Sequence, residues 1–81
     1  MKKKRLAILG STGSIGINAL KVVERLADRF DVTTLTAFNN VDVMIHQIRR
    51  FRPKHVAISA GLIPRLRRLF GNKVEFFDAE H

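Results

Sequence analysis

Apolar and polar positions follow two different periods along this chain. Short apolar or β-branched runs predict strands at Leu6–Leu9, Asp31–Ala37, His55–Ser59 and Lys73–Phe77. Between these runs, apolar residues recur every three or four positions, which predicts helices over residues 14–28, 41–52 and 62–70. Strands that alternate with such helices form βαβ units. We therefore expect an α/β fold of order β-α-β-α-β-α-β with a parallel sheet.

The first βα unit carries specific expectations about burial. The apolar run Leu6–Leu9 does not alternate with polar residues, which predicts a strand covered on both faces. The first helix is expected to bury one apolar stripe and to expose its charged residues. That stripe consists of Ile15, Ala19, Val22, Val23, Leu26, Ala27 and Phe30.

A glycine-rich turn connects the first strand to the first helix. Gly10, Gly13 and Gly16 follow one another at three-residue spacing. A strand, a glycine turn and a helix start in this order are typical of a dinucleotide phosphate site, because backbone N–H groups at a helix start bind phosphate. Gly10 would permit a positive φ, Gly13 would leave room for a pyrophosphate, and Gly16 would let the helix pack closely. The turn predicts a partial Rossmann-like parallel sheet, half of a dinucleotide-binding domain, over residues 1–81.

Hydroxyl groups fill the same turn. Ser11, Thr12 and Ser14 can donate hydrogen bonds to phosphate oxygens. A turn that only packed a helix against a strand is the structural alternative, and it would leave these hydroxyls unexplained. The turn lacks the lysine of a Gly-x-x-x-x-Gly-Lys phosphate loop, so ATP hydrolysis is not suggested.

A second contact with a nucleotide is expected after the second strand. An acidic residue at that point binds the ribose 2′-hydroxyl of NAD, and its absence accommodates the 2′-phosphate of NADP. This chain has Phe38, Asn39 and Asn40 there, and the nearest acid, Asp42, falls in the next helix. The missing acid favours NADP(H). Asn40 also suits the cap of that helix, so capping and nucleotide binding both remain open for it.

Composition limits the other classes of function. The 81 residues include no cysteine, and three histidines stand without metal-ligand spacing, so no metal site is predicted in this chain. No apolar run approaches the roughly 20 residues that span a bilayer, and no membrane association is expected. The formal net charge of +8 makes a small basic nucleic-acid-binding protein an alternative. We expect no specific nucleic-acid partner, because no interleaved aromatic residues or nucleic-acid motif accompany the charge.

Several segments resemble the 1-deoxy-D-xylulose 5-phosphate reductoisomerase family. They are Leu9–Gly16, Leu20–Val23, Asn40–Val41 and Phe51–Ala57. The resemblance implies that NADPH is contacted by two loops, namely by Thr12, Gly13, Ser14 and Ile15 and by Phe38, Asn39 and Asn40. The family usually has a glycine and a basic residue before the asparagine, where this chain has Phe38 and Asn39. The basic residue would pair with the 2′-phosphate, whereas Asn39 can only donate a hydrogen bond to it.

The resemblance also implies an activity. The family converts 1-deoxy-D-xylulose 5-phosphate to 2-C-methyl-D-erythritol 4-phosphate with NADPH and a divalent metal, Mg²⁺ or Mn²⁺, in non-mevalonate isoprenoid biosynthesis. Its members are cytoplasmic homodimers several times longer than this chain, and their metal ligands and sugar-phosphate-binding residues lie in later segments. We therefore expect an N-terminal NADPH-binding segment that is inactive alone, with an exposed edge beside the first strand and a tendency to self-associate. A different Rossmann NAD(P)-binding module is a further alternative.

Overall fold

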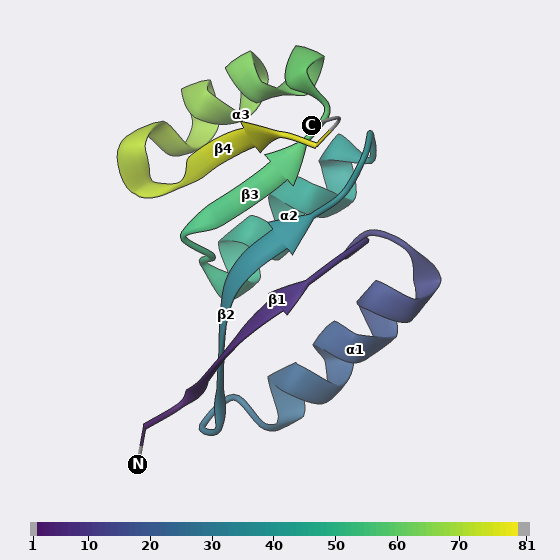
Figure 1. Ribbon diagram of the computed structural model, residues 1–81, viewed down its shortest axis with the longest axis vertical. Coiled ribbons are helices and arrows are strands. Elements are labelled where there is room, and N and C mark those ends of the chain that lie inside the picture. Colours follow the sequence, from purple (N-terminus) through teal and green to yellow (C-terminus); the bar gives the residue numbers. More distant parts are fainter. Residues whose placement is uncertain (1, 80–81) are drawn as a thin grey trace.

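The computed structural model describes residues 2–79 as a parallel sheet with a layer of helices on one face (Figure 1). The strands lie in the spatial order β1 (Lys4–Ile8), β2 (Phe30–Thr36), β3 (His55–Ile58) and β4 (Glu75–Asp78). The helices are α1 (Ser14–Arg25), α2 (Val41–Phe51) and α3 (Ile63–Phe70), with two short 3-10 turns, η1 (Ala60–Leu62) and η2 (Gly71–Lys73). The predicted βα alternation and the parallel sheet are confirmed.

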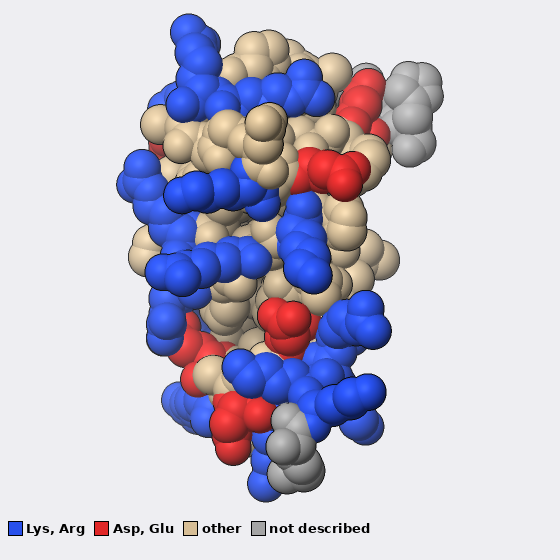
Figure 2. All heavy atoms as spheres, turned by 90° about the vertical axis from the view of Figure 1, so that its left-hand side faces the viewer, with Lys and Arg blue, Asp and Glu red and all other residues tan. Residues whose placement is uncertain are grey.

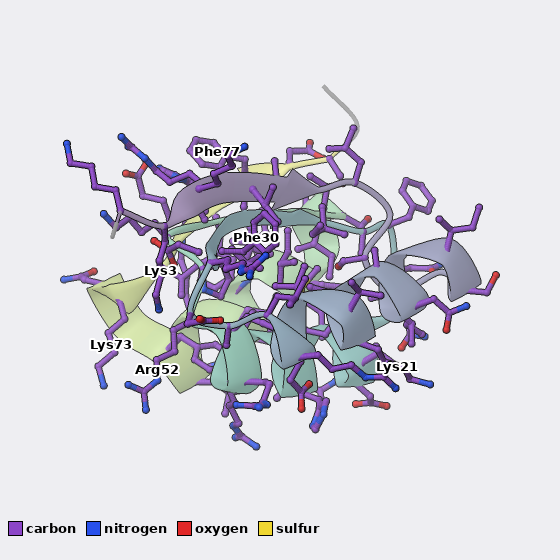
Figure 3. All side chains as sticks on the ribbon, turned by 90° about the horizontal axis from the view of Figure 1, so that it is seen from below. Lys3, Lys21, Phe30, Arg52, Lys73 and Phe77 are labelled. Carbon is purple, nitrogen blue, oxygen red and sulfur yellow. The ribbon has the colours of Figure 1, made fainter. Side chains whose placement is uncertain are left out.

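All three helices cover the same face of the sheet. The strand order advances steadily from β1 to β4, and each crossover returns on the same side, so the helices lie together beneath the sheet (Figure 3). The core forms between these two layers. Its most deeply buried apolar side chains are Leu35, Met44, Val56, Ile58 and Leu66. None of the helices among residues 2–79 is both long and apolar enough to cross a membrane.

The opposite face of the sheet is open, which corrects the prediction for the first strand. Leu6 and Ile8 pack against the core, while Ala7 and Leu9 between and after them are exposed. The strand therefore has one covered face rather than two, because no helix among the described residues crosses above it (Figure 3). Within residues 2–79, β1 forms one border of the sheet, so the expected exposed edge beside the first strand is confirmed for this part of the chain.

The buried face of α1 differs from the predicted stripe. Gly16, Leu20 and Val23 are buried, whereas Ile15 and Val22 point into solvent. At Gly16 the helix packs so closely on the preceding turn that an added Cβ would overlap the Gly10 carbonyl oxygen. That contact turns the residues at four- and seven-position spacing from Gly16 inward, and it turns the flanking Ile15 and Val22 outward.

Basic side chains gather away from the glycine turn. Lys and Arg cover much of the side of the molecule on which α3 runs into β4 (Figure 2). Arg49 and Arg50 lie in the last turn of α2, and Arg67 and Arg68 lie in the last turn of α3. Cations at helix C-termini complement the negative end of the helix dipole. Part of the strongly positive charge thus has a structural role at the ends of two helices.

We expect the protein to self-associate through its open sheet face and the β1 edge. Phe77 lies on this face with 48% of its surface exposed, pointing away from the helices (Figure 3). A free strand edge and an exposed aromatic side chain on an uncovered sheet face each favour contact with a second copy. Sedimentation velocity over a range of concentrations should show a growing heavier species, which Phe77→Lys should reduce. Leu69→Lys on α3 is the control, because Leu69 is equally exposed at 49% in the helix layer. Equal effects of both substitutions would contradict association through the sheet.

Candidate functional site

The two predicted nucleotide-contact loops lie next to each other at the carboxyl end of the sheet. The turn after β1 is held by the end of β2, where the Ser11 N–H donates to the Thr36 carbonyl oxygen at 2.7 Å. The Gly10 N–H donates to Thr36 Oγ1 at 3.1 Å. The segment Phe38–Asn40 begins two residues after Thr36. The structure therefore brings both groups of predicted site residues to the same edge, where ligands of α/β sheets bind.

The start of α1 presents free backbone donors. Gly13 is the N-cap residue with φ −81° and ψ 170°, and no side chain caps the helix. The first intrahelical hydrogen bond runs from the Ile17 N–H to the Gly13 carbonyl oxygen at 2.9 Å. The N–H groups of Ser14, Ile15 and Gly16 precede it and have no intrahelical acceptor. The first turn of α1 contains no acidic residue, so the positive end of its dipole is left for an anion.

Two glycines shape this turn as the sequence predicted. Gly10 has φ +64°, a conformation that glycine adopts without strain. A Cβ on Gly16 would overlap the Gly10 carbonyl oxygen and lie 2.7 Å from Ser11 Cα. The close packing predicted for Gly16 is confirmed, although its partner is the turn itself rather than the strand. Gly13 differs from both, because a Cβ there would meet only the Gly10 carbonyl oxygen, at 3.4 Å.

The hydroxyl groups of the turn do not all face the same way. Ser11 is fully buried in the turn, and its hydroxyl oxygen has no hydrogen-bond partner among residues 2–79. The prediction that Ser11 offers its hydroxyl to a phosphate is therefore wrong. Thr12 is half-buried and Ser14 is exposed, so both hydroxyls remain at the surface of the turn. The α1 start thus offers backbone N–H groups with up to two hydroxyl donors beside them.

Exposed apolar side chains surround the same edge. Ile15, Leu9 and Phe38 expose 86%, 77% and 57% of their surfaces. Leu9 precedes the glycine turn and Ile15 follows it in α1, whereas Phe38 follows β2. Large exposed apolar side chains that are close together are typical of surfaces against which a ligand or another part of a protein packs. Sequence reasoning had assigned Leu9 to a buried strand and missed this position.

Asn39 and Asn40 have different environments. Asn40 Oδ1 accepts from the Val43 N–H at 3.3 Å, so the predicted capping role is confirmed. Asn39 is exposed, and the Ser59 N–H donates to the Phe38 carbonyl oxygen at 2.9 Å, which joins this loop to the end of β3. Neither loop contains a lysine or an arginine. A phosphate at this edge would therefore be bound by dipoles and amides rather than by a basic side chain.

Two residues that support the turn were missed by the sequence analysis. The sequence pattern predicts Thr36 only as a β-branched strand residue and predicts no role for Gln47. Gln47 is buried in α2, and its Nε2 donates to the Ser11 carbonyl oxygen at 2.7 Å. A polar residue within the apolar face of an amphipathic helix, between Met44 and Ile48, was the available signal.

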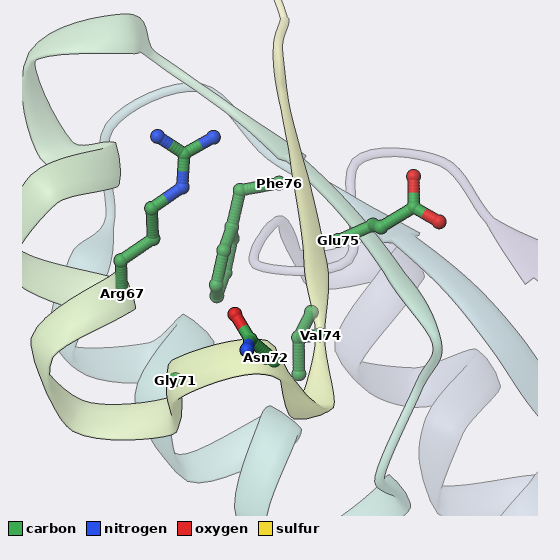
Figure 4. Close-up of a pocket in the computed structure, with 6 residues that line it drawn as sticks. All are labelled: Arg67, Gly71, Asn72, Val74, Glu75 and Phe76. Atoms are coloured by element: carbon green, nitrogen blue, oxygen red, sulfur yellow. The ribbon is translucent and has the colours of Figure 1, made fainter.

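A separate hollow lies away from this edge. Its volume is about 530 Å³, and it is lined by Arg67, Gly71, Asn72, Val74, Glu75 and Phe76 (Figure 4). Arg67 lies alongside the Phe76 ring, while Glu75 points to the other side of β4 (Figure 4). None of these residues belongs to the two predicted loops. Among residues 2–79, no three His, Asp or Glu side chains come together as ligands for a metal ion.

Sequence comparisons with known proteins all point to one family. The family model for 1-deoxy-D-xylulose 5-phosphate reductoisomerase matches residues 6–76. The reductoisomerase of Anaeromyxobacter sp. (strain K) is 58% identical over 55 residues, which cover 68% of this chain and 14% of that protein. The reductoisomerase of Bacteroides fragilis is 52% identical over 59 residues, covering 73% and 15% of the two chains. The chain therefore spans about one seventh of the length of these relatives.

Solved structures give the same result for the fold. The reductoisomerase from Zymomonas mobilis in complex with NADPH superposes with a TM-score of 0.83 and 35% identity, covering 93% of this chain and 20% of that one. A reductoisomerase in complex with NADPH, fosmidomycin and magnesium superposes with a TM-score of 0.87 and 28% identity, covering 95% and 20%. The fold is thus shared with the corresponding fifth of both structures.

Proposed function

This chain belongs to the 1-deoxy-D-xylulose 5-phosphate reductoisomerase family, and on that premise we propose that its residues 1–81 form an NADPH-binding segment. The observation that carries the proposal is the uncapped start of α1 behind a glycine turn. Similar proteins of known structure were solved in complex with NADPH. The two loops at the carboxyl edge of the sheet supply groups suited to the two ends of an adenine dinucleotide phosphate.

The pyrophosphate of NADPH is proposed to bind at the α1 start. The first-turn N–H groups and the dipole of α1 favour a dianion there. Thr12, Gly13, Ser14 and Ile15 are the residues of this contact, with Thr12 and Ser14 able to donate hydroxyl hydrogen bonds. The exposed backbone at Gly13 lets an oxygen approach without meeting a side chain.

The adenosine end is proposed to lie against Phe38, Asn39 and Asn40. The exposed Phe38 ring is suited to stacking on an adenine. The amide groups of Asn39 and Asn40 are suited to donating hydrogen bonds to a 2′-phosphate, since no carboxylate in this loop would repel it. NADPH is therefore preferred to NADH, with a preference limited by the missing basic residue.

The complete reaction is proposed for a longer protein of this family. Bound NADPH would supply the hydride for the reductive isomerisation of 1-deoxy-D-xylulose 5-phosphate to 2-C-methyl-D-erythritol 4-phosphate. The described residues contribute cofactor binding and no group of metal ligands, so this segment alone is expected to have no reductoisomerase activity. We propose that this longer protein also binds a divalent metal and the sugar phosphate. It would act as a homodimer in the cytoplasm.

One titration series tests the proposed function. NADPH, NADH and a DNA oligomer are added separately to the 81-residue protein at physiological salt, and binding is followed by calorimetry. We expect saturable binding of NADPH, weaker binding of NADH, and DNA binding that disappears as salt is raised. Specific DNA binding that survives physiological salt, with no nucleotide binding, would contradict the proposal and favour the nucleic-acid alternative.

Asn39→Arg is expected to strengthen NADPH binding. A guanidinium at this position could pair with the 2′-phosphate, which a neutral amide can only hydrogen-bond. We expect the Kd for NADPH to fall about tenfold while that for NADH stays unchanged. Asn72→Arg is the matched control, since Asn72 is exposed in η2 and lies outside both loops. An equal gain in the control would show that added net charge, and not position 39, is responsible.

A further inference from the structure

Gln47 is a buried polar side chain with an unusual partner. It lies in the middle of α2 with 4% of its surface exposed, and apolar core residues flank it on the helix. Its Nε2 donates to the Ser11 carbonyl oxygen at 2.7 Å, across 36 residues of sequence. Buried amides are retained where their hydrogen bond fixes a specific arrangement. Here the fixed group is the backbone of the glycine turn.

Both backbone polar groups of Ser11 are therefore held by hydrogen bonds. Its N–H donates to the Thr36 carbonyl oxygen of β2 at 2.7 Å, and its carbonyl oxygen accepts from Gln47 of α2. Ser11 Cα also lies directly beneath Gly16 at the start of α1. Any movement of the Ser11 backbone would thus change the position of the turn relative to the first N–H groups of α1.

The helix that carries Gln47 also begins at the second loop. Asn40 caps α2 and Gln47 lies two turns later, so the axial separation is about 10 Å on a rigid helix. At Asn40, α2 supports the loop proposed for the 2′-phosphate, and at Gln47 it supports the turn proposed for the pyrophosphate. Its rigidity sets how these two loops are spaced.

We propose that Gln47 is a positioning residue for the cofactor, which aligns the phosphate-binding turn with the loop Phe38–Asn40 by holding the Ser11 carbonyl. The inference rests on the proposed NADPH binding. It assigns no contact between Gln47 and NADPH, because the side chain lies beneath the turn. Loss of its hydrogen bond lets the turn move while the capped loop at Asn40 stays in place.

The test compares a ligand that spans both loops with one that reaches a single loop. Gln47→Met keeps the length and packing of the side chain but removes the donor. We expect the Kd for NADPH to rise about tenfold, because the displaced turn would lose about one hydrogen bond between its backbone and the pyrophosphate. The Kd for adenosine 2′-monophosphate should change less than about twofold. Both ligands are titrated into the 81-residue protein and followed by NMR.

A second variant keeps the inference testable if Gln47→Met fails to fold. Gln47→Glu has the same shape, and its protonated carboxyl can donate to the Ser11 carbonyl whereas its ionised form cannot. We expect the selective loss of NADPH affinity at pH 8 and its partial recovery at pH 6, relative to wild type at each pH. His46→Met is the control, because His46 is exposed at the adjacent position of α2.

The outcomes separate the two proposals. Equal losses for NADPH and adenosine 2′-monophosphate would mean that Gln47 only stabilises the fold, and unchanged NADPH affinity would mean that it does not position the turn. Either result overturns the role of Gln47. A wild-type protein that binds neither ligand contradicts the proposed function itself.

Discussion

Gly16→Ala is expected to unfold the glycine turn and to abolish NADPH binding with it. The added Cβ would overlap the Gly10 carbonyl oxygen and approach Ser11 Cα to 2.7 Å. These are backbone atoms held by Thr36 and Gln47, so no flexible side chain can yield to the new methyl group. Overpacking against a rigid neighbour costs about 3 kcal/mol or more. A domain of this size has only about 5 kcal/mol of stability to lose.

Thermal unfolding followed by circular dichroism measures this effect. We expect the Tm of Gly16→Ala to fall by about 15 °C, or the variant to be unfolded at 25 °C. Gly61→Ala is the matched control, because a Cβ at Gly61 has no atom within 4 Å and its φ is not positive. The control should change stability by less than about 0.5 kcal/mol. A Gly16→Ala variant as stable as the control would show that α1 can move away from the turn at little cost.

The order of elements was predictable because it depends on local signals. Apolar periodicity marked every strand and helix, and the predicted boundaries differ from the structure by a few residues. Gly10 was predicted to permit a positive φ and has one. Asn40 was predicted as a cap and accepts from the Val43 N–H. Each of these features is decided by residues within a few positions of one another.

Burial was harder to predict because it depends on distant residues. Val32 and Leu35 are both buried although they are three positions apart in a strand, because Thr33 is an extra residue where the register between β1 and β2 shifts. The exposure of Leu9 follows from the absence of any helix over that face in residues 2–79. Neither the register shift nor the open face can be predicted from residues that are close together in the sequence.

The candidate site was predictable in outline for the same reason. Glycine spacing predicted the turn, and the end of the second strand predicted the position of the second loop. The burial of Ser11 and the support from Gln47 arise only when α2 packs beneath the turn, 36 residues later in the sequence. Sequence therefore predicts which backbone would face a ligand better than it predicts which side chains hold that backbone.

Gly13→Ala is expected to weaken NADPH binding without unfolding the protein. Gly13 has extended backbone angles that any residue adopts, and its added Cβ would make an ordinary contact of 3.4 Å with the Gly10 carbonyl oxygen. Alanine is a poorer N-cap than glycine, but it also lowers the entropy of the unfolded chain, and these effects nearly offset each other. We expect the free energy of unfolding to change by less than about 1 kcal/mol.

Binding should respond differently from stability. The new methyl group would occupy the exposed side of the α1 start, where a pyrophosphate oxygen is proposed to approach the backbone. We expect the Kd for NADPH to rise about tenfold or more, measured by titration at physiological salt. The alanine substitutions at Gly13 and Gly16 therefore test two different roles. Gly16 is needed for the packing of α1 on the turn, and Gly13 is proposed to let the pyrophosphate reach the backbone. A Gly13→Ala variant that binds NADPH as tightly as wild type would contradict a close approach of the pyrophosphate to the backbone at Gly13.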